Sequence, residues 1–517
     1  MAGLRHGTWW DKQRGVPLDR IMEGRFTRLF PDIDGAQFPD DDLRMLADAM
    51  TSPVDSPPTS ELKDDAEENP AIEAAYTYLG QFVDHDLTFD QTSHLREFLT
   101  PDQLKNLVDF RTPRFDLDNL YGRGPDDQPY MYAADGVHML LGAPMSGNPH
   151  DTGTVQVPRG PNGRALIGDP RNDENRIVSQ LQSTMLRFHN KVACFLTDKD
   201  PHTSFQDVRQ QVRWHYQWVL VNDFLPTVIN QETINRIFPD PYQPQLSIPK
   251  LQDGLKLMPV EFSVAAYRFG HSMIRPIYRL NQTIQRRPIF STGTDDGADL
   301  GGFRPIPSDW GIDWQSFIDL EHGVPIPPVP DDPNDEIARK PQHAYKIDTA
   351  IVNPLGLLPP AVAANPPSLI LRNLERGATF QLPSGQSVAK ALGVPAIPDD
   401  KLLIGKATGD KVADPKIPIA DIAPGFAGNA PLWTYVLAEA HQTSWDAAPP
   451  STDEDTIPIR LGPVGGTLVG EVFAAILVSD RTSYLYSQPG FSPIPEFTHD
   501  GAFGLAELIN VALGRNP

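Results

Sequence analysis

The chain has 517 residues, with 44 basic and 67 acidic side chains and a formal net charge of −23. A chain of this length can bury a large core, and length alone suggests several domains. Because the excess charge is acidic and no basic stripe stands out, we expect neither nucleic acid nor an anionic membrane surface as a partner.

The N-terminus, the longest apolar stretch and the single cysteine indicate where in the cell the protein is expected. The first twenty residues lack the apolar core of a secretory signal. The longest apolar stretch, 467–478, is interrupted by Glu471 and is too short to span a bilayer. We therefore expect a soluble protein, cytoplasmic or exported without a cleaved signal. Cys194 lies in the apolar run "KVACFL" and is expected to be buried. Nothing in the sequence indicates the oligomeric state.

Apolar residues at helical spacing predict the main elements. The expected helices, in chain order, are 71–87, 175–196, 211–226, 260–280 and 465–480, with the third stopping at Pro226 and the fourth meeting Pro276. Alternating strand patterns are rare and short. We therefore predict a mainly α protein with little β structure.

Proline, with 53 residues, collects between these helices. The stretches 324–341, 353–368 and 447–463 are expected to be long, stiff loops. The polar stretch 52–69 is expected to be mobile and to end an N-terminal extension, 1–69. Since no linker separates independent cores, we predict one domain over residues 1–517.

The first predicted helix carries unusual charge in the stretch "YLGQFVDHDLTFDQ" (78–91). At about 100° per residue, Gln81, Asp84 and His85 share one polar face, and Asp86 points elsewhere. The stretch could be a solvated helix end. Its apolar neighbours leave little room for a solvent-facing stripe, however, and buried carboxylates need partners.

A second group of oxygen ligands follows in "RTPRFDLDNLYG" (111–122). Thr112, Asp116 and Asp118 stand at alternating positions, a spacing that can wrap a hard cation such as calcium. The alternative is an Asx-rich turn, and the "DLD" pattern alone does not decide between them.

Together these motifs resemble the animal-type haem peroxidases, the myeloperoxidase-like members of the peroxidase–cyclooxygenase superfamily. Residues 80–88 resemble the family's distal helix and 111–122 its calcium loop. Residues 168–193 resemble the distal-arginine segment, 267–280 the proximal-histidine helix and 369–377 the strand-like segment that supports it. The motifs occur in the family's order between residues 70 and 380, and 461–485 is similar to the family's last core helix. The resemblance implies a single mainly α domain around one haem; without disulfides, a bacterial member is expected.

The resemblance assigns the peroxide chemistry to three residues. His85 is the expected general base on the distal haem face, because a neutral imidazole can take and return a proton. Arg171 is expected to stabilise the charge that develops on peroxide. Gln81, on the face of His85, is expected to order water or a halide.

It also assigns the haem contacts. His271 is the expected iron ligand, with the amide oxygen of Asn373 accepting the proton of its other ring nitrogen. Arg268, one turn before His271, is expected to pair with a haem propionate, and Arg376 is a second candidate for that contact.

Asp84 and Glu174 match the carboxylates that form ester bonds to haem in mammalian members. The alternative for Asp84 is a hydrogen bond to His85 or to a propionate. A further sulfonium link in myeloperoxidase requires a methionine where this chain has Asn175. We therefore expect haem b with up to two esters and no sulfonium bond.

The resemblance implies a calcium site built from five residues. The expected ligands are the side chains of Asp86, Thr112, Asp116 and Asp118 and the backbone carbonyl of Arg114. The ion would tie the distal helix to the following loop. The other histidines, such as His138, His189, His215 and His441, are expected to be surface or satisfied core residues.

The implied function is a peroxidase that reduces hydrogen peroxide through an oxyferryl intermediate, oxidises phenols, halides or thiocyanate, and responds to oxidative stress. One alternative is a fatty-acid dioxygenase of the same superfamily, although the usual tyrosine position, three residues before His271, is Arg268. Another is a calcium-stabilised adhesion protein without haem.

Overall fold

The computed structural model describes residues 25–53, 65–89, 99–100, 103–104, 107–146, 154–291, 297–322, 341–360, 362–363 and 365–515. Most of the expected mobile stretch 52–69 and of the proline-rich stretch 324–341 lies outside these residues. Residues 68 and 69 already belong to a strand, so the predicted loop ends earlier than expected.

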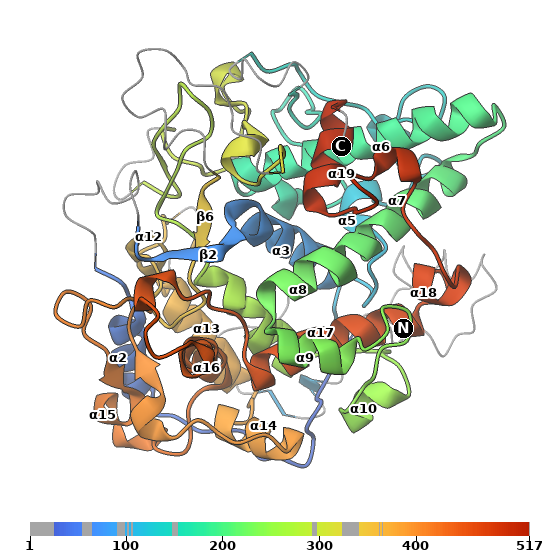
Figure 1. Ribbon diagram of the computed structural model, residues 1–517. Helices are drawn as coiled ribbons and strands as arrows, with labels where there is room; N and C mark the ends of the chain where they lie inside the picture. Colours follow the sequence, from blue (N-terminus) through green and yellow to red (C-terminus); the bar gives the residue numbers. More distant parts are fainter. Residues whose placement is uncertain are drawn as a thin grey trace.

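Helices dominate the described part of the chain (Figure 1). The α-helices are α2 (Asp40–Met50), α3 (Ala74–Leu87), α5 (Asp118–Tyr121), α6 (Arg176–Lys199), α7 (Phe205–Val219), α8 (Leu225–Val228), α9 (Gln231–Ile237), α10 (Pro249–Gln252), α12 (Asn353–Gly356), α13 (Leu369–Thr379), α14 (Gly385–Leu392), α15 (Ile419–Ile422), α16 (Leu432–Ala447), α17 (Pro463–Ser479), α18 (Tyr484–Ser487) and α19 (Leu505–Leu513). Short 3₁₀ and π segments link them, among them η4 (Pro170–Asp173), η5 (Leu220–Phe224), η6 (Glu261–Ala265) and η7 (Ala266–His271).

Strands are short and occur as isolated pairs. The described pairs are β1 (Phe26–Thr27) with β3 (Met258–Pro259) in parallel, and, antiparallel, β2 (Glu68–Glu73) with β6 (His343–Tyr345), β4 (Ile277–Tyr278) with β5 (Arg287–Pro288), and β7 (Leu403–Ile404) with β8 (Ile417–Pro418). The mainly α prediction is therefore confirmed.

One hydrophobic cluster extends from Phe26 to Ala512, so the described residues form one large domain. Figure 1 shows α6, α7 and α19 on one side, α2 and α13 to α16 on the other, and α3, α8 and α17 between them. Helix α17 is apolar on all sides and is buried from Val464 to Leu477, as expected for a central helix. A Cβ at Gly470 would come within 2.6 Å of Ile237 in α9, which explains the glycine there.

Two predicted helices differ from the structure. The third helix does not stop at Pro226, because the π turn η5 precedes it and Pro226 lies in the first turn of α8, where a missing N–H costs nothing. Residues 260–280 do not form one regular helix. They form η6 and η7, ahead of Pro276.

The strand-like expectation for 369–377 is wrong, because these residues form most of α13. Ser368 caps this helix by accepting a hydrogen bond from the backbone N–H of Leu371. Ile370, Leu371 and Leu374 are buried at helical spacing. The local sequence therefore satisfies both the capping and the periodicity of a helix.

The expected burial of Cys194 is also wrong. The residue lies near the C-terminal end of α6, on a face that is exposed. Its sulfur lies 3.5 Å from Nε2 of His138. The apolar residues around Cys194 lie on the other face of the helix, which packs into the core. The exposure of Cys194 therefore does not follow from the residues next to it in the sequence.

Candidate functional site

Helix α3 presents the distal residues. Gln81 and Asp84 are half-buried, whereas His85 is buried. Asp84 accepts a hydrogen bond from the Thr88 hydroxyl at 3.1 Å, so its carboxylate is held at the C-terminal end of its own helix. Gln81 donates to Oε1 of Glu174 at 2.7 Å. The helix therefore contacts the segment that follows η4 through Gln81.

The His85 ring is held from behind. Its Nδ1 lies 2.7 Å from Oδ1 of Asn172 in η4, and this contact requires the hydrogen on Nδ1, since an amide oxygen only accepts. The ring thereby turns its Nε2 towards Glu174, 3.5 Å from Oε1. Burial raises the pKa of Glu174, but His85, Arg171 and Gln81 outweigh it and leave the pKa below its ordinary value.

Arg171 lies beside this histidine. Its Nη2 donates to the backbone carbonyl of His85 at 3.1 Å and to Oδ2 of Asp169 at 2.9 Å. The guanidinium covers the Phe89 ring at 4.3 Å. Asp169 is fully buried and also pairs with Arg111. Burial alone would raise the pKa of Asp169, but the two arginines hold it far below its ordinary value.

On the expected proximal side, Arg268, Asn373 and His271 form a hydrogen-bonded chain. Nδ2 of Asn373 lies 2.8 Å from Nδ1 of His271, and Nη1 of Arg268 donates to Oδ1 of Asn373 at 2.8 Å. The expected partnership of His271 and Asn373 is therefore present. The expected polarity is wrong, because Arg268 takes the amide oxygen and leaves the amide nitrogen facing the ring.

The surroundings of His271 are apolar. Burial, with a smaller contribution from Arg268, lowers the pKa of His271 to about 3, so the ring is neutral at physiological pH. The Trp433 ring on α16 stands at 75° to it with centroids 6.5 Å apart. The Trp433 indole donates to the backbone carbonyl of Arg268 at 3.1 Å. Apart from its two chain neighbours, no atom lies within 4 Å of where a Cβ at Gly270 would stand, so the space at Gly270 is open.

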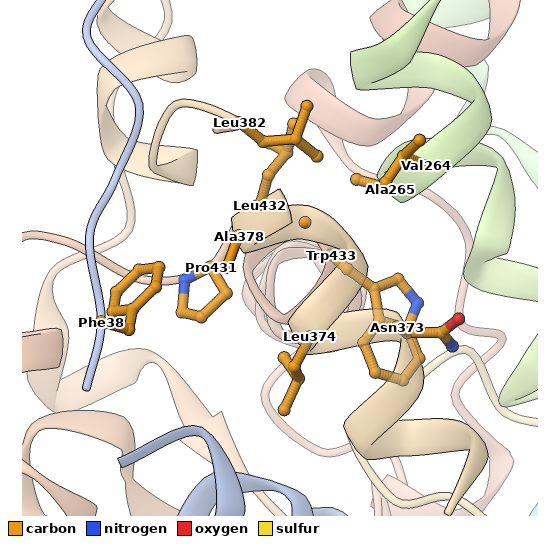
Figure 2. A pocket seen from close by; sticks show the side chains of 11 residues that line it. Phe38, Val264, Ala265, Asn373, Leu374, Ala378, Leu382, Pro431, Leu432 and Trp433 are labelled. Atoms are coloured by element: carbon orange, nitrogen blue, oxygen red, sulfur yellow. The ribbon is translucent and has the colours of Figure 1, made fainter. Parts of the chain in front are cut away.

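A narrow apolar pocket lies behind this group. Asn373 and Trp433 line it together with Val264, Leu374 and Leu432 (Figure 2). Residues of both α13 and α16 line the pocket, and Asn373 borders both the pocket and His271. Arg376, one turn further along α13, has its guanidinium 5.6 Å from the Phe380 ring.

Tyr267 links the distal residues on α3 with the segment that carries His271. Its hydroxyl donates to the carbonyl of Gly80 in α3 at 3.2 Å, and its ring stacks on Phe262 with centroids 4.8 Å apart. Burial, and secondarily the charge of Asp84, raises the pKa of Tyr267 well above its ordinary value. The distal helix and the segment carrying His271 are therefore in direct contact.

The predicted calcium ligands lie close to one another, near Asp86 of α3. Asp86 is fully buried; its Oδ2 accepts from the backbone N–H of Leu117 at 3.2 Å, and among the described residues its Oδ1 has no hydrogen-bond partner. Burial, followed by the charges of Asp116 and Asp118, raises the pKa of Asp86 well above its ordinary value. The Thr112 hydroxyl donates to Oδ2 of Asp116 at 3.2 Å.

The backbone and one arginine complete this region. The N–H of Arg114 donates to the carbonyl of Thr112 at 2.8 Å. Asp118 begins α5 and pairs with Arg209 at 3.4 Å. Within the described ranges, no three His, Cys, Asp or Glu side chains are arranged to hold a metal ion. The four side chains share a neighbourhood without forming a coordination shell.

The other histidines mostly match expectation. His138 pairs with Asp135 at 2.7 Å on the surface. His189 and His215 are buried and hydrogen-bonded, to the Val137 carbonyl and to the Gln211 carbonyl respectively. His441 is the exception, because its buried Nε2 has no hydrogen-bond partner among the described residues.

Sequence reasoning missed three residues of the site: Asn172, Asp169 and Trp433. Asn172 directly follows Arg171 in "DPRNDENR". Its position next to the expected distal arginine could have indicated that it lies in the site. Asp169 precedes that arginine by two residues and offered the same signal. Trp433 is distant in sequence from His271, and no local pattern connects the two.

Comparison with known proteins shows which family the chain resembles. Residues 101–294 match the model of the animal haem peroxidase family, and 153 residues are 31% identical to thyroid peroxidase from Homo sapiens. Over this segment the chain is similar to the animal haem peroxidases. The thyroid peroxidase alignment covers 28% of this chain and 15% of that relative. Across the curated relatives that it matches, the chain spans about a sixth of their length or less.

Solved structures share the fold across nearly the whole chain. Peroxidase A from Dictyostelium discoideum has a TM-score of 0.56 at 14% identity, covering 95% of this chain and 93% of that one. A fatty acid alpha-dioxygenase from Oryza sativa has a TM-score of 0.53 at 14% identity, covering 93% and 77%. At this identity, both comparisons show that the chain shares the fold of these structures. Among the described residues, no helix combines the length and apolar character needed to cross a bilayer.

Proposed function

We propose that this chain is an animal haem peroxidase that binds haem b through His271, reduces hydrogen peroxide and oxidises small electron donors such as phenols, halides or thiocyanate. The observation that carries the proposal is the distal arrangement. Nδ1 of His85 is bonded to Asn172, Nε2 faces Glu174, and Arg171 donates to the His85 carbonyl. We also infer that residues 1–517 form a single domain.

The distal residues support proton transfer to and from peroxide. Bound haem would supply the iron that takes the peroxide oxygen and gives up electrons. Nε2 of His85 would accept a proton from one oxygen of peroxide and return it to the other, a role suited to a neutral imidazole. Arg171, already held by Asp169 and the His85 carbonyl, would stabilise the charge on the departing oxygen.

Gln81 and Glu174 would complete the distal side. Their hydrogen bond of 2.7 Å holds the Gln81 amide near the His85 ring, where it could order water or a halide. Asp84 and Glu174 are the candidates for ester bonds to haem methyl groups. Asp84 is bonded to Thr88 rather than to His85, which supports a carboxylate available to another partner. Haem that remains with the chain during acid–acetone extraction after peroxide turnover would support the esters, and haem that extracts freely would refute them.

The residues fit haem in donor chemistry. His271 is a neutral imidazole, and the side of Gly270 is open. Arg268 and Arg376 are the cations available for the propionates. The fit is incomplete at one point, because the Asn373 amide presents nitrogen to His271.

Calcium is proposed on the unpartnered Oδ1 of Asp86. Asp86, Asp116, Asp118, the Thr112 hydroxyl and the carbonyl of Arg114 are all oxygen donors, which calcium prefers. An ion there would have to draw these groups together, and it would offset the mutual repulsion that raises the pKa of Asp86.

The dioxygenase alternative is less well supported. It would need a tyrosine free for radical chemistry near His271, whereas the Tyr267 hydroxyl is committed to the Gly80 carbonyl. No observation favours the adhesion alternative.

The testing experiment compares His271→Ala with His85→Ala. We expect the first variant to lose the Soret band and the second to keep it while reacting with peroxide about 10²–10⁴ times more slowly. Equal haem content and equal peroxide rates in the two variants would overturn the proposal.

A further inference from the structure

Asn373 is held between two residues of the proximal segment. Its Oδ1 accepts from Nη1 of Arg268 at 2.8 Å, and its Nδ2 lies 2.8 Å from Nδ1 of His271. The side chain is 1% exposed, so water cannot easily replace either partner. The three side chains form one hydrogen-bonded chain.

Arg268 determines which way the amide faces. A guanidinium has only N–H groups and can only donate, so the amide atom that faces it must be the oxygen. Turning the amide by half a rotation would set its NH₂ group against the Arg268 N–H groups. Donor would face donor in a buried site, and neither would be satisfied. The amide can turn only if Arg268 leaves.

The amide in turn determines the tautomer of His271. Nδ1 faces an N–H donor and therefore accepts, with its lone pair in the ring plane. Nδ1 therefore carries no hydrogen, and the ring proton is on Nε2. A protonated ring nitrogen has no lone pair for a metal, so Nε2 cannot bind iron in this arrangement.

We propose that Arg268 is a positioning residue that controls the metal-binding tautomer of His271 through the orientation of Asn373. While Arg268 donates to Asn373, the proton stays on Nε2. When the guanidinium leaves, the amide turns, Nδ1 gains a proton that the amide oxygen accepts, and Nε2 loses its proton to solvent, with no net change in proton number. The inference rests on the proposed role of His271 as haem ligand.

The surroundings allow Arg268 to move without disturbing the backbone. The Arg268 side chain is only partly buried, whereas its carbonyl is fixed by the Trp433 indole at 3.1 Å. Its Nε keeps a second acceptor, the carbonyl of Ser263 at 3.2 Å. A haem propionate would offer the guanidinium a carboxylate in exchange for the amide oxygen, and a charged acceptor is the stronger one.

The tautomer can be measured directly by ¹⁵N NMR of the full-length chain labelled at histidine, before haem is added. The His271 signals are identified by their loss in His271→Gln. We expect Nε2–H in the unsubstituted chain. In Arg268→Met the fraction of Nδ1–H should rise roughly tenfold, the value of one hydrogen bond of this kind.

Two further variants make the result decisive. Asn373→Asp should give Nδ1–H even with Arg268 present, because a carboxylate accepts from both neighbours. Arg372→Met is the matched control, since Arg372 lies next to Asn373 on α13 but donates to the carbonyl of Pro366 at 3.4 Å. It should leave the His271 signals unchanged. Nδ1–H in the unsubstituted chain, or identical signals in Arg268→Met, would overturn the inference.

The rate of haem association provides a second readout. Both Arg268→Met and Asn373→Asp should bind added haem roughly tenfold faster than the unsubstituted chain and Arg372→Met, because the amide no longer has to be released. Equal rates in all four proteins would overturn the inference. Failure of every protein to bind haem would refute the proposed function instead, while the NMR result would still decide the control of the tautomer.

Discussion

Asn172 holds His85 with its amide oxygen at 2.7 Å from Nδ1, whereas Asn373 presents its amide nitrogen to the same atom of His271. The two amides thus present opposite atoms to the two site histidines. Nδ1 of His85 meets an acceptor, which turns its Nε2 towards Glu174. The difference arises from the second partner of each amide: Asn172 donates its Nδ2 to Gln182 at 2.8 Å, and Asn373 accepts from Arg268.

Replacement of Asn172 by leucine should slow the reaction with peroxide. Without the amide oxygen, the Nδ1–H tautomer loses its stabilisation and the ring loses its orientation, so we expect a decrease of roughly tenfold in the second-order rate. The measurement is stopped-flow absorbance of haem-loaded protein mixed with peroxide. Asn235→Leu, at an exposed position on α9, is the control and should keep the full rate. An unchanged rate in Asn172→Leu would mean that the amide does not orient His85.

Asp169→Asn should destabilise the fold. The carboxylate is fully buried between Arg111 and Arg171, and its removal leaves two guanidinium groups without their anion. We expect a loss of about 3–5 kcal/mol in the free energy of unfolding. The check is urea unfolding followed by circular dichroism. Asp127→Asn, which breaks the exposed pair with Arg123, should cost at most about 1 kcal/mol. Equal losses in the two variants would contradict the assigned importance of Asp169.

Glu439 should make stability depend on pH. Burial raises its pKa from 4.5 to about 7, although the N–H groups of Gly465 and Val464 partly offset this. The raised pKa means that the folded state favours the protonated carboxyl. Its contribution is full below pH 4.5 and is lost as pH rises through about 7. The expected loss is about 3 kcal/mol.

The test for Glu439 is the difference between Glu439→Gln and the unsubstituted chain, because other buried carboxyls, such as Asp348, titrate near the same pH. Urea unfolding between pH 4 and 8 should show a smaller fall in the variant. Glu496→Gln, at an exposed position, should leave the slope unchanged. Parallel curves for Glu439→Gln and the unsubstituted chain would exclude Glu439 as the cause.

Calcium should stabilise the chain through Asp86. Addition of calcium to chelator-treated protein should raise the melting temperature, and at a hundredfold excess over Kd the gain should be about 2.7 kcal/mol. Asp86→Asn should abolish the gain, because it removes the unpartnered carboxylate oxygen. Differential scanning calorimetry measures the melting temperature, and elemental analysis measures the bound calcium. A calcium-induced shift that persists in Asp86→Asn would locate the ion elsewhere.

The sequence by itself determined the periodicity of the helices and the directions of their side chains. The pitch of α3 separates Gln81 and His85 from Asp86, and the structure has Asp86 beside Asp116 and Asp118. These features depend on residues close together in the chain. The same is true of α13, whose capping serine and buried leucines were visible but were interpreted as strand-like by resemblance.

Only the tertiary structure decided the hydrogen-bond polarity of the two sites. Asn373 meets Arg268 and His271 across separations of 105 and 102 residues, and no local pattern shows which amide atom each receives. The exposure of Cys194 depended likewise on which face of α6 was left uncovered. Periodicity sets the direction of a side chain, but the donor or acceptor it meets comes from a distant segment, and that partner determines the chemistry of the group.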